Sequence, residues 1–140
     1  MTMRSYKGVY VFDTGAFALF FGGYQPIKPF FDEVFRGDCL GVTCTLLLCE
    51  FWYKTCEKLG KDAANDFYER IITSEIQVVD KLETAKVAAE LKCKYRKQFS
   101  FVDCHALSLA KLYSGKLVTT DSAFKNVDEV EVIYIKPPEK

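Results

Sequence analysis

Residues 9–17 read "VYVFDTGAF", an apolar run of strand-forming residues that stops at Asp13 and passes directly into a helical pattern. A strand followed at once by a helix is typical of a chain in which the two kinds of element alternate. The carboxylate of Asp13 has two interpretations. In the first interpretation, Asp13 caps the helix, because Asp accepts hydrogen bonds from the free N–H groups of a first turn. Alternatively, it belongs to a site, provided that other isolated acids lie at the same edge of the sheet.

The alternation continues on the C-terminal side of this stretch. The sequence predicts strands at 8–13, 39–43, 76–80, 116–121 and 130–135, and helices at 14–21, 29–37, 43–60, 62–74, 82–97 and 101–115. Continuously apolar strands favour a parallel sheet that is covered on both faces. Right-handed crossovers place the carboxyl ends of such strands at one edge, and ligands bind at that edge in open α/β sheets.

Composition limits the class of protein. The chain has 140 residues, of which 49% are hydrophobic, so it is large enough to form one globular domain, residues 1–140. No apolar run approaches the roughly 20 residues of a membrane span, and the first residues lack the features of a signal peptide. We therefore expect a cytoplasmic protein without a membrane association.

Charge balance restricts how the chain can bind nucleic acid, and cysteine spacing disfavours a zinc site. Nineteen basic residues balance nineteen acidic ones, so any binding of nucleic acid requires a local patch. The six cysteines show no C-x-x-C spacing and His105 is the only histidine, which disfavours a zinc site and predicts free thiols.

Four acids are candidates for one site. Asp13 and Asp121 each end a predicted strand, so they meet at the same sheet edge. Glu50 is the only charge within "TCTLLLCEFWY", where an unpaired carboxylate is costly to bury, so it faces either water or the crevice. Asp103 completes the capping box "SFVD", a role that is compatible with facing the same crevice.

The repulsion between four converging carboxylates must be compensated. A pair of like charges at ~4 Å costs on the order of 4 kcal/mol at the effective dielectric of a partly buried site. Such a cluster needs protons or bound cations, and hard oxygen ligands favour Mg²⁺ or Mn²⁺ over zinc. A cation held in this way lowers the pKa of a bound water and neutralises the charge that develops on a phosphate.

Nearby polar residues have supporting roles or structural ones. Thr14 is expected to hold Asp13 or a metal-bound water, or else to cap the helix. Thr119 or Thr120 is expected to do the same for Asp121, although β-branched residues also simply favour strands. His105 lies two residues along a helix from Asp103, and that spacing turns it to the opposite side.

The acidic motifs resemble those of the PIN-domain nucleases in their order and approximate separations. They are "VFDTGAF", the mid-helix Glu50 after a Leu-rich turn, "FVDCHALSLA" and "LVTTDSAFKNV", and the last of these is the most specific. The resemblance implies a three-layer α/β/α fold with a central, mainly parallel sheet of about five strands. It also implies cleavage of RNA with Mg²⁺ (or Mn²⁺) held by Asp13, Glu50, Asp103 and Asp121. The small single domain is similar to VapC-type toxins of VapBC toxin–antitoxin pairs.

The chain departs from the family pattern in the aromatic stretch "FALFFGGYQPIKPFFDEVF", residues 17–35. Exposed aromatic patches mark association surfaces. In the toxins that this chain resembles, the corresponding region helps to form a dimer interface and a groove for the antitoxin. The resemblance therefore implies a homodimer and a VapB-type partner. The alternative is that the helices that follow cover these rings.

Two further assignments stay open. The segment "KCKYRKQFSF" presents Lys94, Arg96 and Lys97 either to RNA phosphates or simply to water as a solvated face. The function also has alternatives, an inactive PIN-like binding scaffold and a phosphoryl-transfer enzyme of the haloacid dehalogenase kind. The latter requires a second acid two residues after Asp13, where Gly15 stands, and the presence of all four acids favours an active site.

Overall fold

The computed structural model describes residues 5–139 and contains a five-stranded parallel sheet in the order β3-β2-β1-β4-β5. Strand β1 is central, and its Val11 pairs with Val42 of β2 and with Leu117 of β4. The strands are β1 (Val9–Phe12), β2 (Leu40–Thr43), β3 (Gln77–Val78), β4 (Lys116–Thr119) and β5 (Glu131–Tyr134). The first strand of the chain therefore lies between strands that are distant from each other in sequence.

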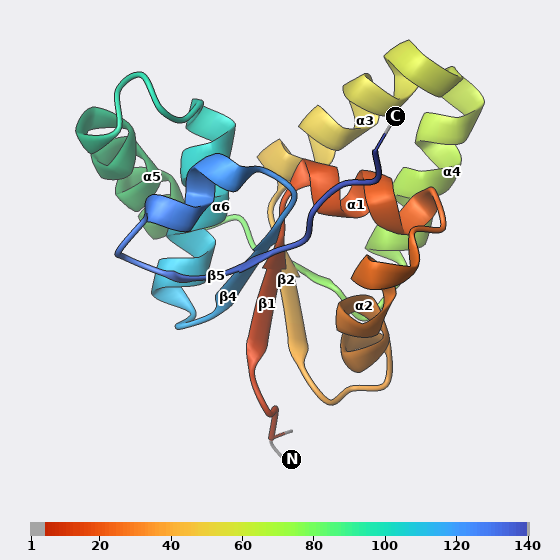
Figure 1. Cartoon of the computed structure of the whole chain (residues 1–140), viewed down its shortest axis with the longest axis horizontal. Coiled ribbons are helices and arrows are strands. Elements are labelled where there is room, and N and C mark those ends of the chain that lie inside the picture. The colour runs from red at the N-terminus through yellow and green to blue at the C-terminus, as the bar shows by residue number, and fades with distance from the viewer. Residues whose placement is uncertain (1–4, 140) are drawn as a thin grey trace.

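Helices cover both faces of this sheet. They are α1 (Thr14–Phe21), α2 (Lys28–Phe35), α3 (Thr45–Leu59), α4 (Lys61–Ile72), α5 (Leu82–Lys94) and α6 (Phe101–Leu112), with short 3₁₀ segments η1 (Gln25–Ile27) and η2 (Ser122–Asn126). Figure 1 shows α3 and α4 on one side and α5 and α6 on the other, rising as two arms beyond the carboxyl ends of the strands. The structure thus confirms the predicted α/β/α fold.

Two hydrophobic cores follow from the alternation of side chains along the strands. Val11 of β1 points to one face and packs in a core with residues of α5 and α6. Tyr10 and Phe12 point to the other face and pack with residues of α1, α2 and α4. Helix α3 contributes to both cores, since Leu47 lies in the first and Leu48 in the second.

The predicted element boundaries hold to within about three residues, and the helix expected at 101–115 ends at Leu112. The strand expected at 76–80 is reduced to Gln77–Val78, which pairs only with β2 at the edge of the sheet. The helix expected at 82–97 ends at Lys94. The cause lies in Lys92, whose ammonium donates to the carbonyl oxygens of Arg96 at 2.7 Å and Phe99 at 2.8 Å and so stabilises a turn.

The aromatic stretch 17–35 is divided between core and surface. Phe17 and Phe31 are buried, and Phe31 stacks on Phe12 at 3.9 Å between ring centroids. Phe35, at the end of α2, keeps 39% of its surface exposed. The expectation that some of these rings remain exposed is therefore met at the end of α2, while the rings nearest the sheet belong to the core.

Among residues 5–139, no helix is both long enough and apolar enough to cross a membrane. All six cysteines lie within this range and are free, with Cys39, Cys44 and Cys104 buried.

Candidate metal and nuclease site

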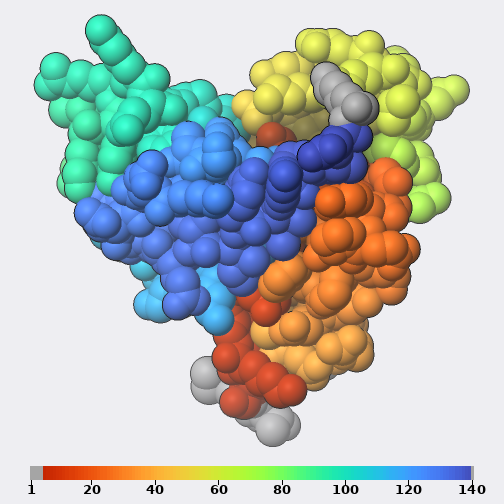
Figure 2. Space-filling view, viewed as in Figure 1, coloured from red at the N-terminus to blue at the C-terminus, as the bar shows by residue number. Residues whose placement is uncertain are grey.

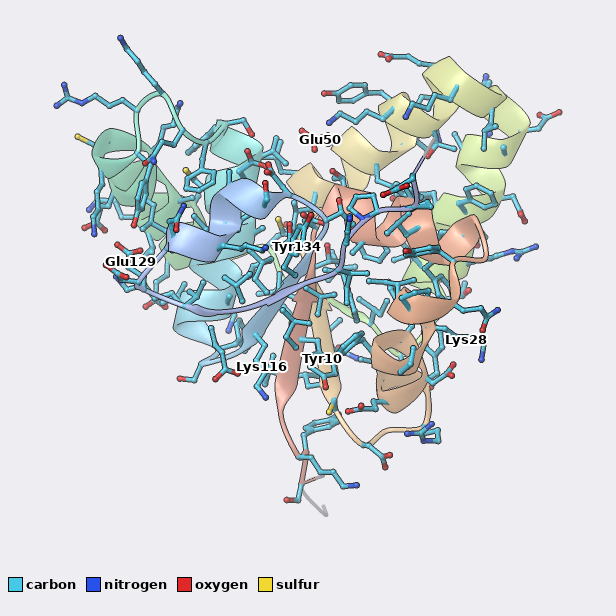
Figure 3. The ribbon with its side chains drawn as sticks, in the orientation of Figure 1. Tyr10, Lys28, Glu50, Lys116, Glu129 and Tyr134 are labelled. Atoms are coloured by element: carbon cyan, nitrogen blue, oxygen red, sulfur yellow. The ribbon has the colours of Figure 1, made fainter. Side chains whose placement is uncertain are left out.

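The four predicted acids come from two strand ends and two helices at the carboxyl edge of the sheet. Asp13 follows β1, Glu50 lies on α3, Asp103 lies in the first turn of α6, and Asp121 follows β4. Figure 3 shows Glu50 in the gap between the two arms. Figure 2 shows this gap as a notch in the surface, with residues from the start of α1 at its floor.

Asp13 is the most deeply placed of the four, with 8% of its surface exposed. It caps α1, since its Oδ1 accepts a hydrogen bond from the N–H of Ala16 at 2.8 Å. Its Oδ2 accepts a hydrogen bond from the hydroxyl of Thr119. The capping role and the site role of this acid are therefore compatible.

Thr119 joins two of the acids. It is fully buried at the end of β4 and donates its hydroxyl to Asp13. The same oxygen accepts a hydrogen bond from the N–H of Asp121 at 3.0 Å. The carboxylate of Asp121 in turn caps η2 by accepting from the N–H of Ala123 at 2.9 Å. Thr119 thus positions both acids at once, which goes beyond the predicted contact with Asp121.

Glu50 is held by two side chains. The hydroxyl of Thr14 donates to its Oε1 at 2.9 Å, and the ammonium of Lys54 lies 3.4 Å from the same oxygen. Only 12% of the Glu50 side chain is exposed. Thr14 therefore contacts Glu50 rather than the neighbouring Asp13, and Asp13 rather than Thr14 caps the helix.

Asp103 is fixed by the predicted capping box. Its Oδ2 accepts from the N–H of Ser100 at 3.0 Å, and its own N–H donates to the Ser100 hydroxyl at 3.0 Å. Burial raises the pKa of Asp103, the bonds to Ser100 lower it, and the charges of Glu50 and Asp121 raise it further. The acid at this helix start therefore experiences the electrostatic field of two of the other acids.

Burial raises the pKa of Asp13 to about 6. The hydrogen bonds from Thr119 and Ala16 oppose this shift, and the charges of Asp103 and Asp121 add to it. Repulsion of this kind requires that the carboxylates lie close to one another. The four acids thus form one electrostatically coupled cluster, here called the acid cluster.

The acid cluster offers the type of ligand atom that a hard cation binds. Its donors are carboxylate and hydroxyl oxygens, which Mg²⁺ and Mn²⁺ prefer. In the described residues, no group of three Asp, Glu, His or Cys side chains is arranged to hold an ion jointly. Mg²⁺ does not require such a cage, because it retains several waters and takes only one or two carboxylates directly.

His105 lies apart from the acid cluster. Its Nδ1 is 2.8 Å from the carbonyl oxygen of Phe101, and the ring lines a separate hollow with Cys44, Asp80 and Thr84. This position agrees with the expectation from helical spacing that His105 turns away from Asp103.

The basic segment before α6 is partly engaged in internal contacts. Lys94 forms an ion pair with Glu129, and Arg96 donates to the carbonyl oxygen of Cys93 at 3.1 Å. Lys97 is exposed. Of the three candidates for binding RNA, Lys97 is the one whose charge is least engaged.

Lys54 is a site residue that the sequence analysis did not name. Its spacing of four residues after Glu50 is the spacing at which opposite charges meet on a helix, so a signal was present in the sequence. The contact between Thr14 and Glu50 had no such signal, because it depends on how α1 packs against α3.

A second feature lies in the aromatic stretch. A cavity of about 340 Å³, here called the aromatic groove, separates α1 and α2 from the end of α4. Its lining includes Phe17, Phe20, Phe31, Phe35, Arg70 and Ile76. An apolar groove with a single cation at its wall is suited to apolar side chains accompanied by an acid.

Comparison with known proteins gives a family and a fold. The family model for the PIN domain matches residues 10–130. No curated protein matched the sequence.

Solved structures resemble the chain over nearly its whole length. VapBC2 from Rickettsia felis, bound to a DNA fragment from its promoter, contains a chain that is 13% identical with a TM-score of 0.75, covering 91% of this chain and 99% of that one. DNA-bound VapBC from Salmonella typhimurium gives 14% identity and a TM-score of 0.71, covering 89% and 96%. VapC20 from Mycobacterium tuberculosis, a toxin that cleaves the sarcin-ricin loop, is 16% identical with a TM-score of 0.65. The match covers 87% of this chain and 98% of that one.

Proposed function

Because this chain belongs to the PIN domain family, we propose that it is a divalent-metal-dependent endoribonuclease and the toxin of a toxin–antitoxin pair. The observation that carries this proposal is that the buried Asp13 meets Asp103 and Asp121 at one sheet edge, where burial first and the charges of these two acids second raise the pKa of Asp13. Mutually repelling carboxylates at a sheet edge are stabilised by protons or by a bound cation, and these oxygen ligands suit a hard cation. The solved structures of similar fold belong to toxin–antitoxin systems and support the toxin role.

The acid cluster supplies the ligands in this proposal. Asp13, Glu50, Asp103 and Asp121 hold Mg²⁺ or Mn²⁺, directly or through waters. When bound, such a cation supplies an activated water for in-line attack on a phosphodiester and neutralises the charge that develops on the phosphate.

The surrounding residues keep these carboxylates in place. Thr119 and Ala16 direct both oxygens of Asp13, and Ser100 fixes Asp103. Thr14 and Lys54 hold Glu50, so its carboxylate stays in the gap between the arms. Asp121 is exposed and therefore meets an incoming RNA strand first.

The aromatic groove is the proposed site of the antitoxin. Apolar side chains of a short, partly disordered VapB-type segment pack against Phe20 and Phe35 in this groove, and Arg70 offers a charge for an acid of that segment. We propose that the toxin is also a homodimer, because Phe35 remains exposed at the edge of the same groove.

The nuclease proposal is tested by removing single carboxylates. We expect Asp13→Asn and Asp103→Asn to abolish cleavage of RNA, and EDTA to abolish cleavage by the wild type, since each change removes a ligand or the cation itself. Cleavage is measured on a fluorescently labelled RNA by gel electrophoresis.

The matched control is Glu57→Gln, which alters an exposed acid two turns after Glu50 on the same helix. This variant should cleave RNA like the wild type. Full cleavage by Asp13→Asn would refute the proposed mechanism.

A further inference from the structure

A second cavity opens directly beside the acid cluster. It has a volume of about 390 Å³, lies between α1, α3 and α4, and is here called the lysine-flanked pocket. Thr14 lines this pocket and also donates to Glu50, so one residue belongs to both the pocket and the cluster. A group bound in the pocket is thus held immediately next to the carboxylates.

The wall of the pocket is aromatic. Phe21, Phe51 and Phe67 all line it. The Phe21 and Phe67 rings lie 4.5 Å apart between centroids at an interplanar angle of 14°, and those of Phe21 and Phe51 lie 5.8 Å apart at 22°. Phe21 and Phe67 are half-buried and stack on each other, whereas Phe51 is buried behind them, and together they form an apolar aromatic wall against which the flat face of a nucleobase can pack.

The remaining part of the wall is cationic. Lys54 and Lys58 stand one turn apart on α3, and both line the pocket. Lys54 contacts Glu50, whereas within residues 5–139 no carboxylate lies within ion-pair distance of Lys58. An aromatic wall beside an unpaired ammonium group, here that of Lys58, is the combination that binds a base together with its phosphate.

We infer that the lysine-flanked pocket binds one nucleotide of single-stranded RNA next to the bond that is cleaved, with the base against the phenylalanine rings and a phosphate at Lys58. This inference rests on the ribonuclease function proposed above and adds a subsite to it. Charge complementarity favours RNA over a peptide here, because the pocket carries two lysines and continues into the acid cluster. The aromatic groove, with its single Arg70, has neither property.

Binding can be measured without cleavage in an Asp121→Asn background with Mg²⁺. The probes are 5′-fluorescein-labelled hexauridylate and hexaadenylate, followed by fluorescence anisotropy. In this background, Ala18→Trp fills the pocket from an exposed position in its lining, and Lys58→Ala removes the unpaired cation. We expect each change to weaken binding about fivefold or more, and Lys58→Ala to reduce the salt slope by about 0.7.

Two matched controls make the same substitutions on the opposite arm. Ala89→Trp and Lys86→Ala alter exposed residues of α5 and should bind both oligonucleotides like the parent. Unchanged circular dichroism and melting temperature of Ala18→Trp show that any loss of binding is not a loss of fold. Lys58→Ala tests the same pocket without added volume.

A double-mutant cycle tests whether a base occupies the pocket, because it combines removal of a base from the RNA with filling of the pocket in the protein. Hexauridylates that lack one base at successive positions are compared in the parent and in Ala18→Trp. We expect one position at which removing the base weakens binding about fivefold to a hundredfold in the parent and has no further effect in Ala18→Trp.

The outcomes separate this inference from the proposed function. If the wild type neither cleaves nor binds any RNA in Mg²⁺, the ribonuclease proposal fails and the subsite fails with it. If the wild type cleaves RNA but Ala18→Trp and Lys58→Ala bind both probes like the parent, only the subsite is overturned. Loss of antitoxin binding by Ala18→Trp with full retention of RNA binding would assign the pocket to the protein partner and would also overturn it.

Discussion

Thr119 shows how one buried hydroxyl organises a charged site. It donates to the carboxylate of Asp13 and accepts from the backbone of Asp121, and it has no exposed surface. A buried carboxylate is tolerated when donors satisfy its oxygens, and Thr119 and Ala16 satisfy one oxygen each. The remaining penalty on the charged carboxylate comes first from its burial and then from the neighbouring negative charges of Asp103 and Asp121.

This penalty predicts a pH dependence of stability. The pKa of Asp13 is about 6 in the folded protein against an ordinary value of 3.8. Between these pH values the folded state binds more protons than the unfolded state, so the free energy of unfolding falls as pH rises. A shift of about two units corresponds to roughly 3 kcal/mol. We expect Asp13→Asn to be more stable than wild type by up to about this amount at pH 7.5 without metal, and equally stable near pH 4.

Urea unfolding at both pH values measures the difference. Asp128→Asn, which alters an exposed acid, should follow the wild type at both. Addition of Mg²⁺ at pH 7.5 should stabilise the wild type more than Asp13→Asn, because the cation compensates the charge that this variant lacks. Identical pH profiles for wild type and Asp13→Asn would show that burial of Asp13 carries no penalty.

Among the secondary elements, α2 packs closely on β2 because position 41 has no side chain. A Cβ added at Gly41 lies 2.8 Å from Cγ1 of Val34, closer than carbon atoms in a packed core approach, and makes a tight contact of 3.3 Å with Ile76. We expect Gly41→Ala to lower the free energy of unfolding by about 1–3 kcal/mol. Chemical denaturation measures this change.

Gly8→Ala is the matched control, since a Cβ at that position meets nothing within 4 Å. This control should unfold at the same denaturant concentration as the wild type. If Gly41→Ala also unfolds there, α2 can shift away from the strand without loss.

The predicted elements agree with the structure where local signals decide them. The helix at 14–21 begins after a capping Asp and ends at Gly22, and the structure has these bounds. Strand β3 is shorter than the apolar run at 76–80, because only Gln77 and Val78 of this run pair with β2. The end of α5 depends on the Lys92 side chain reaching two carbonyl oxygens, a contact that periodicity does not encode.

The same distinction holds for the candidate site. Strand ends and a capping box predicted where Asp13, Asp121 and Asp103 lie, because topology collects them at one edge, whereas the sequence left open whether Glu50 faces water or the crevice. The contacts among them were not predictable, because they depend on packing between elements. Thr14 contacts Glu50 across the α1–α3 interface, and Thr119 at the end of β4 donates to Asp13 at the end of the neighbouring β1.

On the scale of the whole molecule, the aromatic groove predicts self-association. Phe35 is 39% exposed at the end of α2, and its ring lies 5.7 Å from that of Phe20. We expect the wild type to form a homodimer in solution and Phe35→Asp to dissociate it, because a charge at an apolar interface is costly to desolvate. Multi-angle light scattering over a range of concentrations measures the mass.

Leu82→Asp is the control, since this residue is 88% exposed on the opposite arm and should not alter the mass. Phe31→Asp is uninformative, because Phe31 is buried and its replacement would unfold the domain. A wild type that remains monomeric at high concentration would exclude the dimer.

The strand order also sets when the protein becomes complete during its synthesis. One side of β1 can pair early with β2, but its other side awaits β4, whose Leu117 pairs with Val11. Until the ribosome has made that part of the chain, the nascent polypeptide has an open strand edge and lacks Asp121. Pairing between such distant segments is also intrinsically slow. A growing chain therefore cannot assemble its four acids before most of the domain exists, which delays the site until late in translation.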